Sequence, residues 1–359
     1  MNLLNSTPLE RPDPRARKSM RRVLRLRWLL LSGLLLPLGG CHVVQSTLSS
    51  SGPAASRIAS MQWWMLILFC VTTLIMWVLF TWAAIRKRGT LKEHAPSDTG
   101  GGQGWILYGG MLSLIVLFVL FAYGLVLMQS FPIHNPTHSD TPPSILIIGH
   151  QWWWEVRYLG NPSGPKFITA NEIHIPVNQP VTLELETADV IHSFWVPRLH
   201  GKVDMIPGHP NFIRIEASQP GAYQGQCSSF CGQEHALMRL LVVAQPAAQY
   251  QAWLNEQTQP GAEPTTPQAI QGKQIFVSAA CTQCHTVRGT SASGIKGPDL
   301  THIGSRRFLA SDVFPNNDAY LAAWVVHAQS LKPGALMPNL PNFNGRQLLD
   351  MVAYLRQLK

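Results

Sequence analysis

The stretch CSSFCGQEHALM, residues 227–238, places two thiols, an imidazole and a thioether within a short loop-like segment. Cys227 and Cys231 lie four positions apart, and His235 and Met238 follow them. Thiolate, imidazole and thioether form a soft ligand set, which favours copper. A disulfide between the two cysteines would leave the histidine and the methionine unexplained, and structural zinc sites are built from cysteine and histidine rather than methionine.

The segment around this stretch has the pattern of an all-β domain. Residues 144–245 contain short runs rich in β-branched and aromatic residues, separated by proline, glycine and asparagine, which is typical of a sandwich or barrel. The runs are SILIIGHQWWWEVRYL, EIHIPVNQPVTLELET, NFIRIEA and LMRLLVVA. Within ADVIHSFWVP, residues 188–197, His192 stands at the start of an expected strand and offers one more ligand from outside the cysteine stretch.

Composition and charge place the chain in a membrane. Of 359 residues, 46% are apolar and only 13% are charged. The net charge of +9 lies at the N-terminal side, because residues 129–359 carry as many acidic as basic side chains. The basic residues therefore belong to targeting and topology, and no nucleic-acid partner is expected.

The N-terminal region predicts a signal peptide over residues 1–40. An arginine-rich segment precedes WLLLSGLLLPLGGC, whose apolar core is too short to span a bilayer. The ending LGGC resembles a bacterial lipoprotein cleavage box, with Cys41 as the lipid-bearing new N-terminus. A plain signal peptide and an uncleaved anchor are the alternatives.

Two longer apolar runs, residues 61–85 and 105–130, predict transmembrane helices with tryptophan near their ends. The basic segment RKRGTLKEH between them is expected on the cytoplasmic side. Both ends of the mature chain would then face outward from a bacterial plasma membrane, on the periplasmic side. Cys70 lies in the first span and is expected to be a packing residue.

The motif CTQCH, residues 281–285, predicts covalent haem c. Cys281 and Cys284 can form thioethers to the haem vinyl groups, and His285 can supply an axial imidazole. A redox CxxC needs no following histidine, and a zinc site needs a second ligand pair. Residues 269–359 have helical apolar spacing and, with GPDLTHIGSR and LMPN, resemble class I cytochrome c. That resemblance implies Met337 as the sixth iron ligand, with His302 as a poorer candidate.

The segments HQWWWEVRY, DVIHSFWVPRLHGKVDMIPG and GQCSSFCGQEHALM resemble subunit II of the haem–copper cytochrome c oxidases. The two spans match that family's hairpin, and the haem motif matches its branch with a fused C-terminal cytochrome c. The resemblance implies a cupredoxin-like barrel that holds a dinuclear copper centre. The ligands that it implies are bridging thiolates, terminal imidazoles, a weak axial thioether and one main-chain oxygen: Cys227 and Cys231, His192 and His235, Met238, and the carbonyl of Ser229.

The resemblance also implies roles for four further features: the side chain of Ser229, Trp152, Lys202 and Asp204. Where this chain has Ser229, the family usually has a glutamate that also helps bind magnesium against subunit I, so one carboxylate ligand of that site is missing here. The residue matching Trp152 lies on the route by which electrons enter. Lys202 and Asp204 match positions near the subunit I interface.

The expected architecture is a multidomain membrane protein: a two-helix transmembrane hairpin, an all-β cupredoxin-like barrel and an all-α class I cytochrome c domain. The expected bounds are a signal peptide at 1–40, an N-terminal segment with both spans at 41–130, a copper domain at 131–245, a linker at 246–268 and a haem domain at 269–359.

The expected function is to pass electrons from a soluble or membrane-bound cytochrome c through haem c and the copper pair to oxidase subunit I. That partner would reduce oxygen to water and pump protons, and the other oxidase subunits and membrane lipid would be further partners. Three rival functions are nitrous oxide reduction, which needs a histidine-rich catalytic domain, copper delivery, which rarely comes with covalent haem, and quinol oxidation, whose subunits lack the copper ligands.

Overall fold

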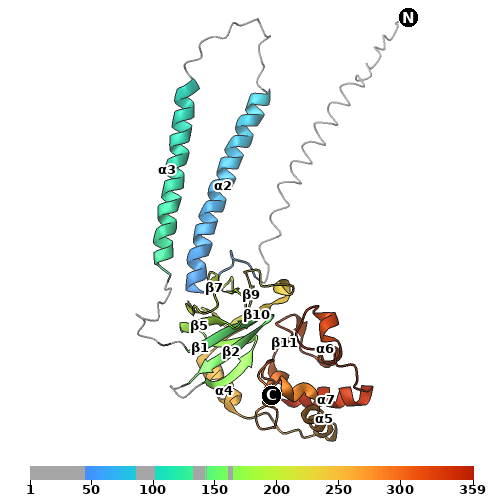
Figure 1. Ribbon diagram of the computed structural model, residues 1–359. Coiled ribbons are helices and arrows are strands. Elements are labelled where there is room, and N and C mark those ends of the chain that lie inside the picture. The colour runs from blue at the N-terminus through green and yellow to red at the C-terminus, as the bar shows by residue number, and fades with distance from the viewer. Residues whose placement is uncertain (1–44, 86–101, 132–141, 143, 161–164) are drawn as a thin grey trace, which may run out of the picture. The chain divides into compact units, whose positions relative to one another are not determined.

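A computed structural model gives the fold of most of the chain (Figure 1). The residues that it describes are 45–85, 102–131, 142, 144–160 and 165–359. The predicted signal peptide, Cys41 and the basic segment between the two spans lie outside the described residues. The predictions made for them therefore stay predictions.

Two long helices begin the described chain: α2 runs over Pro53–Ile85 and α3 over Gly102–Gln129. Both are long and apolar enough to cross a membrane, and most of their large apolar side chains are exposed. At about 1.5 Å per residue, α2 is about 50 Å long, which exceeds a hydrocarbon core of about 30 Å. The two predicted spans are thus confirmed as helices, and α2 begins earlier than expected, at Pro53.

The chain just before α2 is fixed to the β domain. The backbone N–H of Ser51 donates to the carbonyl of Arg198 (2.7 Å), and Nη2 of Arg198 donates to Oγ of Ser51 (2.7 Å). At the next residue, Gly52, a Cβ atom would overlap the carbonyl oxygen of Glu216, so only glycine allows this close approach. The first apolar helix therefore leaves the β domain from a defined point.

Ten strands form the central β-sandwich, drawn in green to yellow in Figure 1. They are β1 Ile145–His150, β2 Trp153–Leu159, β3 Pro165–Ala170, β4 Glu172–Pro176, β5 Val181–Thr187, β6 His192–Trp195, β7 Val203–Met205, β8 Asn211–Ile215, β9 Gly221–Cys227 and β10 Arg239–Gln245. One sheet has the order β3-β2-β1-β5-β8 and the other β4-β10-β9-β6-β7. Pairing is antiparallel except between β1 and β5 and between β4 and β10.

The core of the sandwich consists of inward-facing side chains from both sheets. Trp154 is fully buried and meets Phe194 edge-to-face, with ring centroids 6.1 Å apart. Cys227, Cys231 and Met238 belong to the same buried cluster. The thiol-rich stretch therefore lies at the edge of the core rather than on a free loop, and the expected cupredoxin-like domain is confirmed.

The first half of the segment predicted as a linker is a helix. α4, Ala247–Thr258, follows β10 directly, and its Trp253 stacks on His174 of β4 with ring centroids 3.9 Å apart. Tyr250, Trp253 and Leu254 stand at helical spacing and pack on the sandwich core. This apolar stripe ties α4 to the β domain. The residues after it are hydrogen-bonded to the C-terminal domain, because the N–H of Gly261 donates to the carbonyl of Arg288 and the N–H of Thr265 donates to Oε1 of Gln357.

The C-terminal domain is mainly helical, as predicted, and is drawn in orange to red in Figure 1. Its elements are α5 Pro267–Ser278, the short helices η4 Ala280–Gln283 and η5 Ile303–Ser305, the two-stranded hairpin β11 Phe308–Leu309 with β12 Phe314–Pro315, α6 Asp318–Leu331 and α7 Gly345–Gln357. Side chains of Thr266, Asn317 and Asn344 cap the starts of α5, α6 and α7.

The crossing of α5 and α7 depends on one glycine. A Cβ atom at Gly272 would overlap the carbonyl oxygen of Asp350, so the two helix backbones touch at this point. Phe276 and Tyr354 pack beside the crossing, with ring centroids 5.7 Å apart. This pair of helices frames the segment that carries the CxxCH motif.

Candidate functional site

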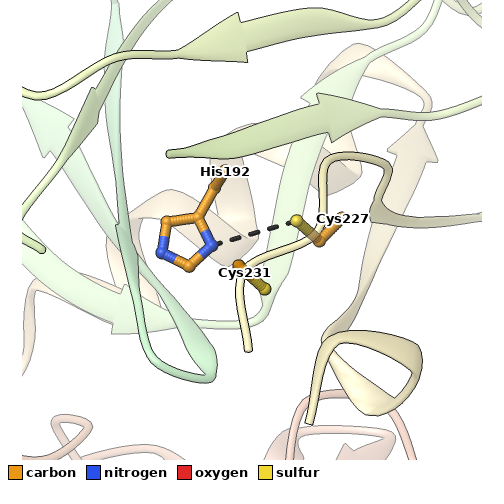
Figure 2. A group of neighbouring side chains, drawn as sticks. All are labelled: His192, Cys227 and Cys231. Atoms are coloured by element: carbon orange, nitrogen blue, oxygen red, sulfur yellow. Dashed lines mark hydrogen bonds between the residues drawn. The ribbon is translucent and has the colours of Figure 1, made fainter. Parts of the chain in front are cut away.

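Three of the predicted copper ligands meet at one end of the sandwich. His192 opens β6, Cys227 ends β9, and Cys231 lies in the loop that follows. Their potential ligand atoms all lie within 4.8 Å of one another, and all three side chains are buried. Figure 2 shows the three side chains facing one space, with Nδ1 of His192 3.9 Å from Sγ of Cys227.

The other three predicted groups approach the same sulfur atoms. Nδ1 of His235 lies 3.6 Å from Sγ of Cys231, and Sδ of Met238 lies 3.8 Å from that sulfur. The carbonyl oxygen of Ser229 lies 3.1 Å from Sγ of Cys227. Every group named from the sequence is therefore at this site, and their role as metal ligands stays a prediction.

Main-chain geometry holds the two halves of the site together. The N–H of Cys227 donates to the carbonyl of Met238 (2.9 Å), which joins the end of β9 to the start of β10. A Cβ atom at Gly149 would lie 2.7 Å from the ring of His192, so glycine is needed for that ring to occupy its place. Gly232 has φ +116°, a backbone conformation that other residues rarely adopt.

Asp189 orients the imidazole of His192. With Nδ1 turned toward Cys227, the ring donates from Nε2 to Oδ1 of Asp189 (2.8 Å). The carboxylate is itself fixed by the backbone N–H groups of Val190 and Gln151, both at 2.7 Å. A metal-binding histidine commonly donates its second nitrogen to a carboxylate in this way. Sequence reasoning missed Asp189, which stands three residues before His192.

The two thiols differ in how readily they lose a proton. A hydrogen bond with Cys231 lowers the pKa of Cys227 to about 4, and the same interaction raises the pKa of Cys231. Burial lowers the pKa of His192, but the hydrogen bond to Asp189 and the thiol of Cys227 outweigh it and raise that pKa. A metal ion binds both sulfurs as thiolates, so its binding would release protons from this pair.

The aromatic run at 152–154 reaches the same loop. Nε1 of Trp152 donates to the carbonyl of Cys231 (3.1 Å), and Nε2 of Gln151 donates to the same oxygen (2.8 Å). Trp154 is buried in the core, whereas Trp153 is half-buried and stacks on His150. Of the three tryptophans, Trp152 is the one hydrogen-bonded to the loop that carries the predicted copper ligands.

Ser229 also contacts Asp204, which the resemblance predicts to lie near a subunit interface. Its Oγ donates to Oδ1 of Asp204 (3.0 Å), and both Asp204 and Lys202 are exposed. The hydroxyl of Ser229 therefore points toward Asp204, and the main-chain carbonyl of Ser229 points toward Cys227.

The CxxCH motif forms a second site in the C-terminal domain. Cys281 and Cys284 are half-buried and form no disulfide within the described part of the chain. Nδ1 of His285 lies 2.8 Å from the carbonyl of Pro298, so the ring donates there and leaves Nε2 available as a ligand. Burial lowers the pKa of His285, which keeps the imidazole neutral as an axial ligand must be.

The surroundings of this motif fit a haem. Nε of Arg306 is buried and has no hydrogen-bond partner among the described residues, and an acidic haem substituent would satisfy it. Ile295 and Leu336 expose 84% and 77% of their area, apolar surface that a macrocycle could cover. Met337 lies half-buried between α6 and α7, and its pairing with His285 stays a prediction.

His302, the other possible axial ligand, is buried elsewhere in a polar contact. Its Nδ1 lies 3.4 Å from Nη2 of Arg288. Burial and that guanidinium lower the pKa of His302 to about 4. This contact gives His302 a structural partner, and Met337 stays the predicted sixth ligand.

Comparisons with known proteins match both parts of the chain. Residues 160–245 match the family model for the periplasmic domain of cytochrome c oxidase subunit II, and residues 269–359 match that for cytochrome c. Cytochrome c oxidase subunit 2 of Alkalihalophilus pseudofirmus is 33% identical over 93% of this chain and 97% of its own length. The Bacillus subtilis protein of the same name is 26% identical over 92% and 97%.

Among solved structures, the periplasmic domain of subunit II of cytochrome oxidase of Bradyrhizobium japonicum is 28% identical and covers 33% of this chain and 95% of its own, with a TM-score of 0.31.

Proposed function

The chain belongs to the family of cytochrome c oxidase subunit II, with a cytochrome c domain at its C-terminal end, and we propose that it is the subunit at which electrons enter a respiratory oxidase. Electrons from a donor cytochrome c would reach haem c in the C-terminal domain, then a dinuclear copper centre, then subunit I. There, oxygen would be reduced to water with proton pumping. The chain itself would make and break no substrate bonds.

The convergence of four predicted ligand groups on the sulfur atoms of Cys227 and Cys231 carries this proposal. Cys227 and Cys231 would bridge two copper ions, His192 and His235 would bind one each, and the remaining contacts would be the thioether and a carbonyl. The bound copper pair and the haem each supply one-electron redox chemistry. The β-sandwich would limit the movement of the ligands when the charge changes.

Trp152 is the proposed link between the loop and its surroundings. Its indole N–H bonds to the carbonyl of Cys231, one of the two proposed bridging residues. That hydrogen bond gives a short connection from an aromatic ring to residues 227–238, which we call the copper loop. We propose that electrons pass through this region.

The proposed orientation follows the charge pattern. The basic segment at 86–94 would stay in the cytoplasm, which places the copper and haem domains on the outer face of a bacterial plasma membrane. Cys41 would carry lipid after removal of residues 1–40. Mass spectrometry of the intact subunit decides this point, because retention of the leader or an unmodified Cys41 would exclude it.

Two mutants separate the two centres. Replacing Cys281 and Cys284 with alanine should abolish covalent haem and oxidation of the donor cytochrome, while a small artificial reductant still feeds copper and supports oxygen uptake. Replacing Cys227 with serine should leave haem reduction fast but stop oxygen uptake. Stopped-flow absorbance at the haem and copper bands, with oxygen uptake alongside, measures both steps.

Cys70→Ser, in the first apolar helix, is the matched control and should behave as the unmodified protein does. Metal analysis of the purified outward domain, residues 130–359, should give two copper ions and one haem iron per chain. A single zinc in place of copper would favour a structural site, and normal oxygen uptake by the Cys227 mutant would show that the haem feeds subunit I directly.

A further inference from the structure

The haem domain touches the copper domain through its β11–β12 hairpin. Oγ of Ser311, at the hairpin tip, donates to the carbonyl of Trp152 (2.8 Å). The backbone N–H of Arg307, at the hairpin base, donates to Oε2 of Glu172 on β4 (3.0 Å). Both domains lie within one compact unit, residues 44–359. The contact is therefore specific and polar, and it includes the tryptophan that reaches the copper loop.

A buried lysine stands at the centre of this contact. Lys332 follows the end of α6, and only 3% of its surface is exposed. Its Nζ donates to the carbonyls of Trp152 (3.0 Å) and Leu237 (3.1 Å), with a longer contact to that of Ala310 (3.4 Å). An ammonium group has three N–H donors, and here each has an acceptor from a different segment.

Burying this charge is costly, and burial lowers the pKa of Lys332 to about 8. A buried charge is weak evidence for a stable contact, because hydrogen bonds seldom repay its lost hydration in full. Such a group can still select one geometry, since every other arrangement leaves the charge unsatisfied. In this arrangement the ammonium of Lys332 meets carbonyls of both domains at once: those of Trp152 and Leu237 in the copper domain and that of Ala310 in the haem domain.

The segment that follows Lys332 carries the predicted axial methionine. At Gly334, a Cβ atom would lie 3.4 Å from the ring of Trp152 and 2.9 Å from Oε1 of Gln233 in the copper loop. Met337 comes three residues later. On the copper side, Leu237 directly precedes Met238. Lys332 thus connects the backbone next to one predicted ligand with the segment that bears another.

We propose that Lys332 is a positioning residue that sets segment 332–337 of the haem domain against Trp152 in one register, so that electrons cross between the domains at one fixed separation. The proposal rests on the proposed function. Lys332 would set the geometry of the contact, and neither the haem nor the copper pair would depend on Lys332 for its own assembly or reduction.

The test uses Lys332→Met in the complete oxidase, because methionine keeps the length of the side chain and removes the charge. Haem reduction by the donor, and copper reduction by a small reductant, should match the unmodified protein. Electron transfer from haem to copper should become multiphasic and slow by roughly tenfold or more, since ångström-scale misplacement of reacting groups has effects of that size. Lys273→Met is the control, because the amine of Lys273 pairs with Glu263 inside the haem domain.

A second measurement does not depend on turnover. Oxidised haem iron shortens the spin-relaxation time of the copper centre, and the effect depends on the distance between the two centres. The copper EPR signal therefore reports the spread of haem-to-copper distances. Lys332→Met should broaden the distribution of distances. Lys332→Arg keeps the charge, so its distribution should be narrower than that of Lys332→Met. A single phase at the normal rate with unchanged relaxation in Lys332→Met would overturn the proposal.

Two further outcomes are informative. If Lys332→Met lowers haem or copper content, Lys332→Gln, which keeps a donor without charge, replaces it: multiphasic transfer supports the proposal and normal transfer overturns it. If the unmodified protein itself shows no haem-to-copper transfer, the proposed function is wrong, and that result is distinct from a failure of Lys332 alone.

Discussion

At the scale of single residues, the copper loop shows how far ligand identity can be predicted. The residue types and spacing of Cys227, Cys231, His235 and Met238 are enough by themselves to indicate a soft metal site. Asp189 escapes such reasoning because an aspartate in a turn before a strand is common and carries no metal signature by itself. Its role depends on the ring orientation of a histidine, which only three-dimensional geometry shows.

Removing the carboxylate at position 189 should loosen the proposed copper site. In Asp189→Ala, Nε2 of His192 loses its acceptor, so the ring is less well oriented toward Cys227. Loss of such a supporting carboxylate typically lowers metal affinity by about 10- to 100-fold. Copper retention during dialysis against a graded chelator measures this. Asp318→Ala, which removes an exposed partner of Arg356 in the haem domain, is the control and should retain copper normally.

At the scale of elements, periodicity predicts the strands and the C-terminal helices but not the points where elements touch. Residues 246–268 predict a linker because prolines and polar residues dominate them, yet α4 lies in their first half. Its three aromatic and aliphatic residues at helical spacing are the available signal for that helix. The crossing of α5 and α7 has no such signal, because Gly272 in a helical pattern looks only like a weak helix former.

Gly272→Ala should destabilise the haem domain by about 3 kcal/mol or more, at the upper end for overpacking, because the new methyl group meets a backbone that cannot move aside locally. Thermal unfolding followed by haem absorbance measures the change. Gly345→Ala is the matched control, since no atom lies within 4 Å of a Cβ there, and its stability should change by less than about 1 kcal/mol. Equal unfolding temperatures for both variants would contradict the close helix crossing.

At the scale of the whole molecule, the order of the parts is predictable and the docking of the two soluble domains is not. Each domain has its own motif, which fixes its identity locally. The contacts between them join residues far apart in sequence, and Lys332 and Asp312 look in the sequence like ordinary surface charges. A tether of free coil is therefore the natural expectation, whereas the structure has a helix on one side of the connection and a polar interface beyond it.

Asp312 gives that interface a predicted pH dependence. It lies at the hairpin tip beside Ser311, is buried, and neither carboxylate oxygen has a hydrogen bond of good geometry within the described chain. Burial and the charge of Glu172 raise its pKa to about 7, while Arg239 and the nearby amide of Gln224 lower it only in part. These three neighbours belong to β4, β10 and β9 of the copper domain.

Because the docked pKa of Asp312 lies above its ordinary value of 3.8, docking takes up a proton. Docking should therefore be strongest in acid, weaken as the pH rises from about 4 to about 7, and level off above that. Each pKa unit corresponds to about 1.4 kcal/mol, so the loss amounts to a few kcal/mol. Asp312→Asn, which keeps the shape without the charge, should make docking nearly independent of pH over this range.

Hydrogen exchange of the β11–β12 hairpin amides in the complete oxidase, corrected for the intrinsic pH dependence of exchange, measures docking directly. The unmodified protein should lose protection between about pH 4 and about pH 7, and Asp312→Asn should keep it, with about 1 kcal/mol or more separating the two at pH 8. Asp318→Asn, a charge removal at an exposed site of the same domain, should follow the unmodified curve. If protection of the unmodified protein did not change with pH, Asp312 would be ionised in the docked state. The interface would then have to stabilise a carboxylate that has no hydrogen bond of good geometry among the described residues.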